Sequence, residues 1–153
     1  MAPLIVLLIS FAVFWMLNKF ALSNRFSISF IGRTSLALML LLASTAHFSN
    51  APAMVQMMPA FLPFKVQLVY FTGILEIAVA IGLWINRTTK MASIVLIVFF
   101  ILILPSNVIG SLKRVELGGM ENGPIYLFFR IPLQFLFIWW AYYFGIRKFE
   151  RKN

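Results

Sequence analysis

The sequence predicts an all-α membrane protein with five transmembrane helices. Hydrophobic residues make up 62% of the 153-residue chain and charged residues only 11%, far from the balance of a soluble globular domain. The apolar residues gather in five stretches, each close to the roughly 20 residues that a helix needs to cross the hydrocarbon of a bilayer. These stretches take up most of the chain, so what remains is short connections and a short tail.

The five stretches cover residues 3–20, 30–48, 65–84, 91–109 and 124–145. The first stretch lacks a basic region before it and a small-residue cleavage site after it, so we expect a retained helix rather than a signal peptide. Residues 50–64 contain three Pro and three Met, which predicts a loop packed in the membrane interface. As a second reading, the methionines of this segment form an adaptable apolar lid.

Lys and Arg are distributed unequally between the two sides of the predicted helices. Three of them, Lys65, Lys113 and Arg114, fall on one side. Nine fall on the other side: Lys19, Arg25, Arg33, Arg87, Lys90, Arg147, Lys148, Arg151 and Lys152. The positive-inside rule then predicts an N-terminus outside and a cytoplasmic C-terminus, with the bacterial cytoplasmic (inner) membrane as the expected location. All four Trp also fall near the predicted inner ends of their helices, as an aromatic belt requires.

The composition also excludes several kinds of site. The net charge of +9 lies mostly where anionic lipid headgroups are expected, so membrane lipids rather than nucleic acid are the predicted partners. Cysteine is absent, which excludes thiol redox chemistry and thiolate metal ligands. With a single His and no Asp, no protein-only metal site and no intrinsic cofactor are expected.

A few polar residues interrupt the apolar stretches, and their depth follows from the rise of about 1.5 Å per residue in a helix. Glu76 lies eleven residues after Lys65, or about 16 Å into a hydrocarbon core about 30 Å thick, close to its midplane. Gln134 shares this depth on the last helix, and Arg130 lies one turn above it. Two further polar residues, His47 and Asn107, lie toward the outer ends of their helices. All five polar groups therefore fall in the same, outer half of the membrane.

Arg130 is the expected partner of Glu76, because a lone carboxylate in hydrocarbon costs about 2.5 to 3.5 kcal/mol on insertion scales. Pro132 lies between Arg130 and Gln134 and frees a backbone carbonyl near the same place. Two interpretations follow: a structural ion pair that joins two helices, or a polar cavity open to the outside. We prefer the cavity, because buried ion pairs stabilise little once desolvation is counted and more polar groups share this half of the membrane.

The other polar candidates each allow a structural and a functional role. His47 is either an interfacial residue bonded to a loop or a proton relay, because imidazole titrates near neutrality. Asn107 either satisfies the carbonyls freed by Pro105 or contacts a ligand. Gln134 is more often a bond between helices than a ligand contact. Ser106 and Tyr70 complete the candidate ligand-binding residues.

Four short motifs carry a family resemblance: HF at 47–48, TGILEIAVAIGL at 72–83, LPSNV at 104–108 and RIPLQFLFIWW at 130–140. In order and spacing they resemble the conserved blocks of DoxX-like membrane proteins over about residues 30–146. The resemblance implies an antiparallel four-helix bundle with converging polar blocks, to which this chain adds an N-terminal helix. Ser44 and Ser106 are mild departures from the family pattern. The implied division is residues 1–26 for the added helix and its connection, 27–146 for the DoxX-like domain and 147–153 for a basic tail.

The expected function is binding of a lipid-soluble small molecule, such as a quinone, in an outward-facing pocket. Some relatives resemble the membrane subunit of quinone-linked oxidoreductases, so any catalysis is expected within a redox complex. In this role Glu76 accepts or exchanges a proton, and Arg130 holds that charge or an anionic or carbonyl group of the ligand. The orienting hydrogen-bond partners are Gln134, Asn107 and His47. Two alternatives stay open: a scaffold subunit that docks a partner membrane protein or a second copy, and a small proton-coupled transporter.

Overall fold

The computed structural model describes residues 2–150 of the chain and confirms an all-α membrane protein. Within these described residues, five helices are long and apolar enough to cross a membrane. They are α1 (Ala2–Phe20), α2 (Ile28–Ser49), α4 (Lys65–Trp84), α5 (Thr89–Leu112) and α6 (Ile125–Tyr142), the last continued by a π-helical turn, η2 (Tyr143–Arg147). Shorter elements are α3 (Ala51–Met57), the 3₁₀ turn η1 (Met120–Asn122) and α7 (Lys148–Glu150). Each predicted span coincides with one of the five long helices.

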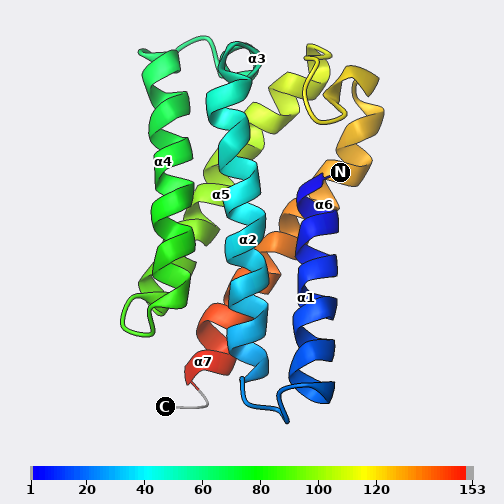
Figure 1. The fold of residues 1–153 in the computed structure, drawn as a ribbon. Coiled ribbons are helices and arrows are strands. Elements are labelled where there is room, and N and C mark those ends of the chain that lie inside the picture. Colours follow the sequence, from blue (N-terminus) through cyan, green and yellow to red (C-terminus); the bar gives the residue numbers. More distant parts are fainter. Residues whose placement is uncertain (1, 151–153) are drawn as a thin grey trace.

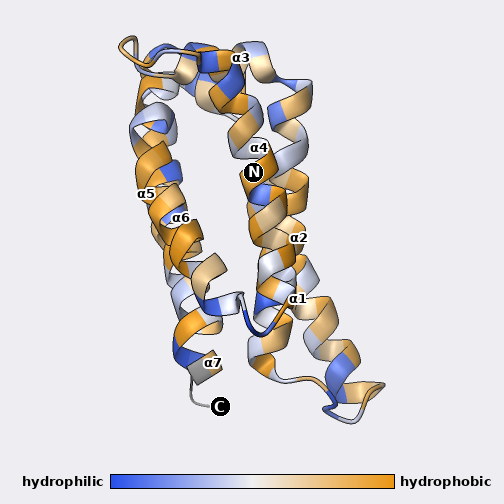
Figure 2. Cartoon of the chain, turned by 90° about the vertical axis from the view of Figure 1, so that its left-hand side faces the viewer, coloured by the Kyte–Doolittle hydropathy of each residue, from blue (hydrophilic) through white to orange (hydrophobic). Residues whose placement is uncertain are grey.

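The long helices form two layers and run alternately up and down. Helices α1, α2 and α4 lie side by side with α2 in the middle, and α5 and α6 form the second layer (Figure 1). Short connections impose this antiparallel order. We name the two ends of the bundle after the short helices that lie there, the α3 end and the α7 end. Hydrophobic residues dominate the middle of every long helix, and polar ones gather toward the ends (Figure 2).

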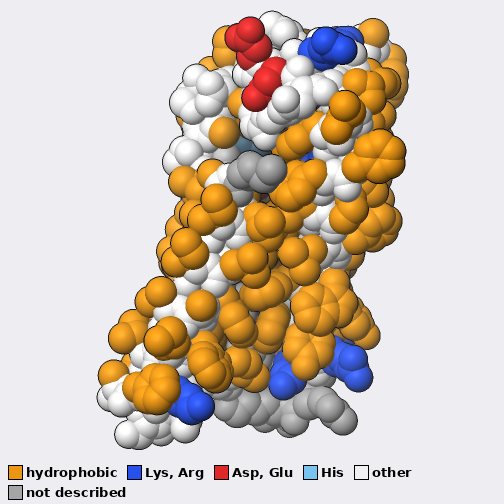
Figure 3. All heavy atoms as spheres, turned by 90° about the vertical axis from the view of Figure 1, so that its right-hand side faces the viewer, with side chains coloured by type: hydrophobic (Ala, Val, Ile, Leu, Met, Phe, Trp, Pro, Cys, Tyr) orange, Lys and Arg blue, Asp and Glu red, His pale blue; other side chains and the backbone are white. Residues whose placement is uncertain are grey.

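The core is apolar and tightly packed. Leu36, Leu40, Leu83 and Leu96 are fully buried at its centre. The other faces of the helices are apolar but exposed, and their side chains form a broad hydrophobic surface between the two ends (Figure 3). A helix that is apolar on all sides fits a lipid environment, where the outward side chains contact acyl chains.

Small residues let the helices approach closely, as is usual in membrane bundles. A Cβ on Gly145 would lie only 1.9 Å from Oγ of Ser93, so the end of α6 can contact α5 only with glycine there. A Cβ on Gly73 would lie 2.7 Å from Cβ of His47, so α4 lies directly against the end of α2 at that level. The second contact matters for the candidate site, because it fixes the position of His47.

One segment differs from its predicted conformation. Residues 51–57, expected in a loop, form the short helix α3. Pro52 lies in the first turn of α3, where its missing N–H leaves no intrahelical bond unmade. Helix α3 covers the α3 end of the bundle and brings its methionines over the interior.

Candidate functional site

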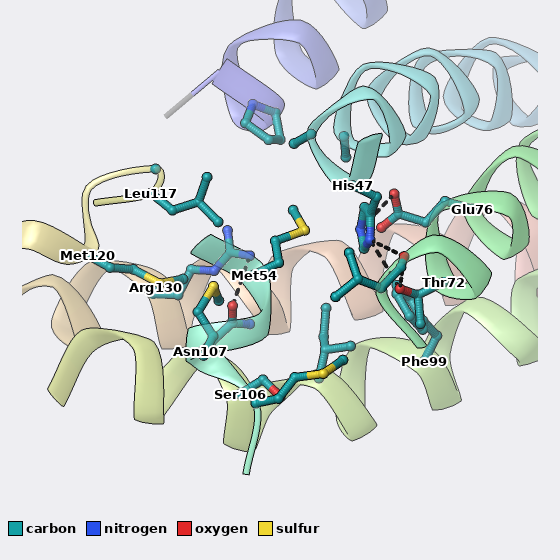
Figure 4. Close-up of a pocket in the computed structure, with 18 of the residues that line it drawn as sticks. His47, Met54, Thr72, Glu76, Phe99, Ser106, Asn107, Leu117, Met120 and Arg130 are labelled. Atoms are coloured by element: carbon teal, nitrogen blue, oxygen red, sulfur yellow. Dashed lines mark hydrogen bonds and ion pairs between the residues drawn. The ribbon is translucent and has the colours of Figure 1, made fainter. Parts of the chain in front are cut away.

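A cavity of about 270 Å³ lies among the helices at the α3 end. Its walls come from the last turns of α2, from α3, from the first half of α4, from the second half of α5 and from the first turns of α6. Pro3, near the start of α1, and the connection between α5 and α6, with Leu117, Gly118 and Met120, complete the lining. The lining is mostly apolar, and two pairs of polar side chains face each other across it, with Met54 between them (Figure 4).

The first polar pair is His47 with Glu76. Nε2 of His47 lies 3.5 Å from Oε2 of Glu76, a distance that marks an ion-pair contact rather than a hydrogen bond. Glu76 is only 5% exposed, and its Oε2 makes no hydrogen bond. The imidazole is therefore the group that compensates the carboxylate, and the pair can hold one proton on either partner.

The orientation of His47 is fixed from the other side of its ring. Nδ1 lies 2.9 Å from the carbonyl oxygen of Val69 and 3.0 Å from Oγ1 of Thr72. A carbonyl oxygen can only accept, so the hydrogen-bond network assigns the proton to Nδ1. Nε2 then faces Glu76 with a lone pair in neutral imidazole, or with an N–H in imidazolium. The helix contact at Gly73 and this bond to Val69 together hold the ring toward Glu76.

The second polar pair is Arg130 with Asn107. Nη2 of Arg130 donates to Oδ1 of Asn107 at 3.4 Å, and Tyr126, one turn earlier on α6, is a second partner of the guanidinium. Two donors of this pair remain buried without any acceptor: Nδ2 of Asn107 and Nε of Arg130. Buried donors are almost always satisfied in native proteins, so a ligand or water oxygen is expected beside them.

The predicted pairing of Glu76 with Arg130 is not formed. No nitrogen of Arg130 lies within 4.0 Å of a Glu76 carboxylate oxygen, because the only such contact of this carboxylate among residues 2–150 is with His47. Both residues nevertheless line the same cavity, as expected for two side chains at similar levels along neighbouring helices. The rotation of each helix about its own axis turns Glu76 toward α2 and Arg130 toward α5.

The cavity gathers five of the seven candidate site residues. His47, Glu76, Ser106, Asn107 and Arg130 all line it. Gln134 does not: its Nε2 donates to the carbonyl oxygen of Phe100 at 2.6 Å and ties α6 to α5. Tyr70 is 40% exposed on the outer face of α4, where its ring stacks on Phe48 at 5.9 Å.

Replacing Gln134 by leucine is expected to weaken the fold and leave ligand binding unchanged. The bond from Gln134 to α5 is internal to the helix pair, and such bonds contribute about 0.6 to 2 kcal/mol in membrane proteins. The free energy of unfolding in mixed micelles measures this loss, and the amount of co-purified ligand measures binding. A variant with normal stability that has lost its ligand would contradict this assignment.

Several lining residues were not among the predicted site residues. Thr72 orients His47, and Tyr126 contacts Arg130. Tyr126 was not singled out from the sequence, although its spacing of four residues from Arg130 was a usable signal. Four methionines also line the cavity: Met54, Met57 and Met58, from and just after α3, and Met120 in η1. The first three agree with the predicted methionine lid, since unbranched thioether side chains adapt readily to a ligand.

The described part of the chain holds no cluster of three or more His, Cys, Asp or Glu side chains suited to a metal ion. The cavity instead offers neutral and charged hydrogen-bonding groups in apolar surroundings. Such a site suits an organic molecule that carries a few oxygen atoms.

Fold and cavity together define a membrane protein of five spanning helices, among the residues that the structure describes, with a mostly apolar pocket that holds two polar pairs at one end of the bundle. Residues 36–145 match the family described as Domain of unknown function (DUF8561), and the chain belongs to this family. No curated protein and no solved structure matches the chain. The matched segment runs from α2 to η2 and contains both polar pairs of the cavity.

Proposed function

We propose that this protein binds a lipid-soluble small molecule with an oxygen-bearing head, of the quinone type, in the cavity at the α3 end. One observation carries the proposal. Three buried polar atoms without hydrogen-bond partners belong to residues that line a single, mostly apolar cavity: Oε2 of Glu76, Nδ2 of Asn107 and Nε of Arg130. Leaving each unsatisfied costs about 1 to 3 kcal/mol, so a complementary ligand would recover a substantial free energy.

The chemistry of the two pairs fits such a head. Asn107 and Arg130 offer N–H donors, which bind a carbonyl or an anionic oxygen. Glu76 and His47 offer a carboxylate and an imidazole, which can accept a proton from a ligand hydroxyl or return one. A cavity of about 270 Å³ has room for a polar head, while a longer apolar tail would extend between the helices into the lipid.

The resemblance to DoxX-like membrane proteins supports a place for this chain in a quinone-linked redox complex. In that setting electrons come from a partner subunit, and this chain contributes the ligand pocket and the proton-exchanging pair. The count of Lys and Arg supports an orientation with the α3 end outside and the α7 end cytoplasmic, in a bacterial inner membrane. The cavity would then open in the outer half of the membrane.

Mass spectrometry of the protein released directly from native membranes tests the proposed function. The wild-type protein should carry an apolar molecule with carbonyl or hydroxyl oxygens, and Asn107→Leu should lose most of it because the substitution removes two hydrogen-bonding groups at similar volume. Tyr70→Leu is the matched control, since Tyr70 lies outside the cavity. Wild-type protein that carries no such molecule above background, or equal loading of all three proteins, would refute the proposal.

The competing function is that of a scaffold subunit, and the surface of α1 is the observation that favours it. In α1 only Leu7 and Asn18 are buried, so most of this helix is open to lipid or to a partner helix. Purification in mild detergent separates the two functions. A stoichiometric partner that is lost on polar substitution of Ile9 and Met16, both outward-facing on α1, with no effect from Asn107→Leu, would favour the scaffold.

A further inference from the structure

A second cavity lies at the α7 end, distant from the first. It has a volume of about 320 Å³ and lies between the start of α2, the α4–α5 turn and α7. Three basic residues, Arg25, Arg33 and Lys148, line it together with the polar Ser27 and Asn86. The proposed binding of a lipid-soluble molecule makes no use of this cavity.

Arg33 is the central feature of this second cavity, because it is a buried cation without an acidic partner among the side chains that the structure describes. It is only 4% exposed, its Nη1 donates to Oγ1 of Thr89, and its Nη2 donates to Oδ1 of Asn86 at 3.2 Å. Nε is buried and has no acceptor. Among the side chains that the structure describes, no carboxylate lies within 4.0 Å of this guanidinium.

Aromatic rings lie against Arg33 but do not neutralise it. Its guanidinium carbon is 5.7 Å from the ring centre of Phe30 and 5.1 Å from that of Phe149. Cation–π contacts of this kind compensate only part of the cost of burying a charge. An anion bound in the cavity beside Arg33 would balance the charge of the guanidinium.

Two further features of the cavity favour an anion. Arg25 and Lys148 add positive charge at its rim, from opposite ends of the chain. The cavity also borders the N-terminus of α2, a helix of 22 residues whose dipole places partial positive charge there. Ser27, the N-cap, accepts a bond from the N–H of Phe30 and keeps its own hydroxyl hydrogen to donate.

We propose that this cavity is a binding site for a phosphate group, carried by the headgroup of an anionic phospholipid or supplied as free phosphate. Arginine is the side chain best matched to phosphate oxygens, through charge-assisted hydrogen bonds from a planar guanidinium. The cavity lies at the edge of the hydrophobic surface, where basic side chains appear below the apolar belt (Figure 3) and where the headgroups of a bilayer belong. A purely structural role for Arg33 accounts for its bonds to Thr89 and Asn86 but leaves Nε and the two rim cations unexplained.

Lipid retention measured by native mass spectrometry tests this site. The protein is reconstituted in vesicles of equal parts phosphatidylglycerol and phosphatidylcholine, released, and the bound lipids are counted. The test variant is Arg25→Gln/Lys148→Gln, which removes both rim cations and keeps the bonds of Arg33 that hold the fold. The control is Lys19→Gln/Arg87→Gln, which removes the same charge at the same end of the bundle but outside the cavity. In a second arm, inorganic phosphate is added to each protein in neutral detergent and the melting temperature is followed.

The wild-type protein and the control should retain phosphatidylglycerol in preference to phosphatidylcholine. In the test variant the ratio of the two retained lipids should fall by about tenfold. That result assigns the site to a lipid headgroup. A rise of melting temperature with inorganic phosphate in the wild type and the control but not in the test variant, without a lipid preference, assigns it to free phosphate. Equal behaviour of all three proteins in both arms, or equal loss in test variant and control, overturns the proposal.

Discussion

Arg130→Met should release most of the small molecule bound at the α3 end. The substitution removes the charged donor of the second polar pair and leaves a side chain of the kind that already surrounds it, as in Met54 and Met120. A hydrogen bond to a charged group contributes about 1.5 to 3 kcal/mol, so retention should fall about ten- to a hundredfold. Ligand content per protein after extraction measures the change.

The control for this variant is Lys113→Met. Lys113 is an exposed cation at the same end of the bundle, it does not line the cavity, and its Nζ donates to the backbone oxygen of Gln56. The control should keep its ligand. The proposed role of Arg130 is wrong if Arg130→Met retains the molecule at the wild-type level, or if both variants lose it to the same extent.

His47→Leu should destabilise the protein by about 3 to 5 kcal/mol, the usual cost of leaving a buried charge without its partner. Among the described residues, the carboxylate of Glu76 would lose its one ion-pair contact within 4.0 Å, since Arg130 bonds to Asn107 and does not contact Glu76 at that distance. The double variant His47→Leu/Glu76→Leu should regain most of this loss, because replacing both members of a buried pair by apolar residues is often neutral. The free energy of unfolding in mixed micelles provides the measurement.

Thr72→Val serves as the control for the His47→Leu and His47→Leu/Glu76→Leu variants. It removes the hydrogen bond that Oγ1 of Thr72 accepts from Nδ1 of His47 and leaves the pair with Glu76 intact, so it should cost only about 0.5 to 1.5 kcal/mol. A double variant no more stable than His47→Leu alone would show that charge pairing is not what the histidine contributes. Ligand content measured on the same samples should be low in the double variant even where stability has recovered, because both proton-exchanging groups are absent.

The spanning helices were predictable because bilayer thickness and helix rise are both fixed quantities. Residues 65–84, for example, form α4 with the expected bounds. The same two quantities placed Glu76 and Arg130 at depths that meet, and both line one cavity. Depth says nothing about the direction in which a side chain points around its helix. That angle depends on packing, here on the contact of α4 with α2 at Gly73, and it gives Glu76 the histidine as its partner.

The parts of the site that the sequence did not reveal share a physical reason. Met120, which was not predicted, is far in sequence from Met57 and becomes its neighbour through Gly110 of α5: a Cβ added there would lie 2.8 Å from Cγ of Met57 and 2.7 Å from Sδ of Met120. Arg33 looked like one more basic residue of the cytoplasmic side, and only the structure shows it buried. Both features depend on how segments pack in three dimensions, which no local pattern encodes.

The two cavities differ in how much of their lining lies within the family segment, residues 36–145. Every described residue that lines the cavity at the α3 end lies within this segment except Pro3. Of the described residues that line the second cavity, at the α7 end, only Asn86 lies within the family segment. The first pocket is therefore built almost wholly from the segment that matches the family, while the second is built mostly from the residues that flank it. The two proposed binding sites thus draw on different parts of the chain, so a substitution in one leaves the lining of the other unchanged.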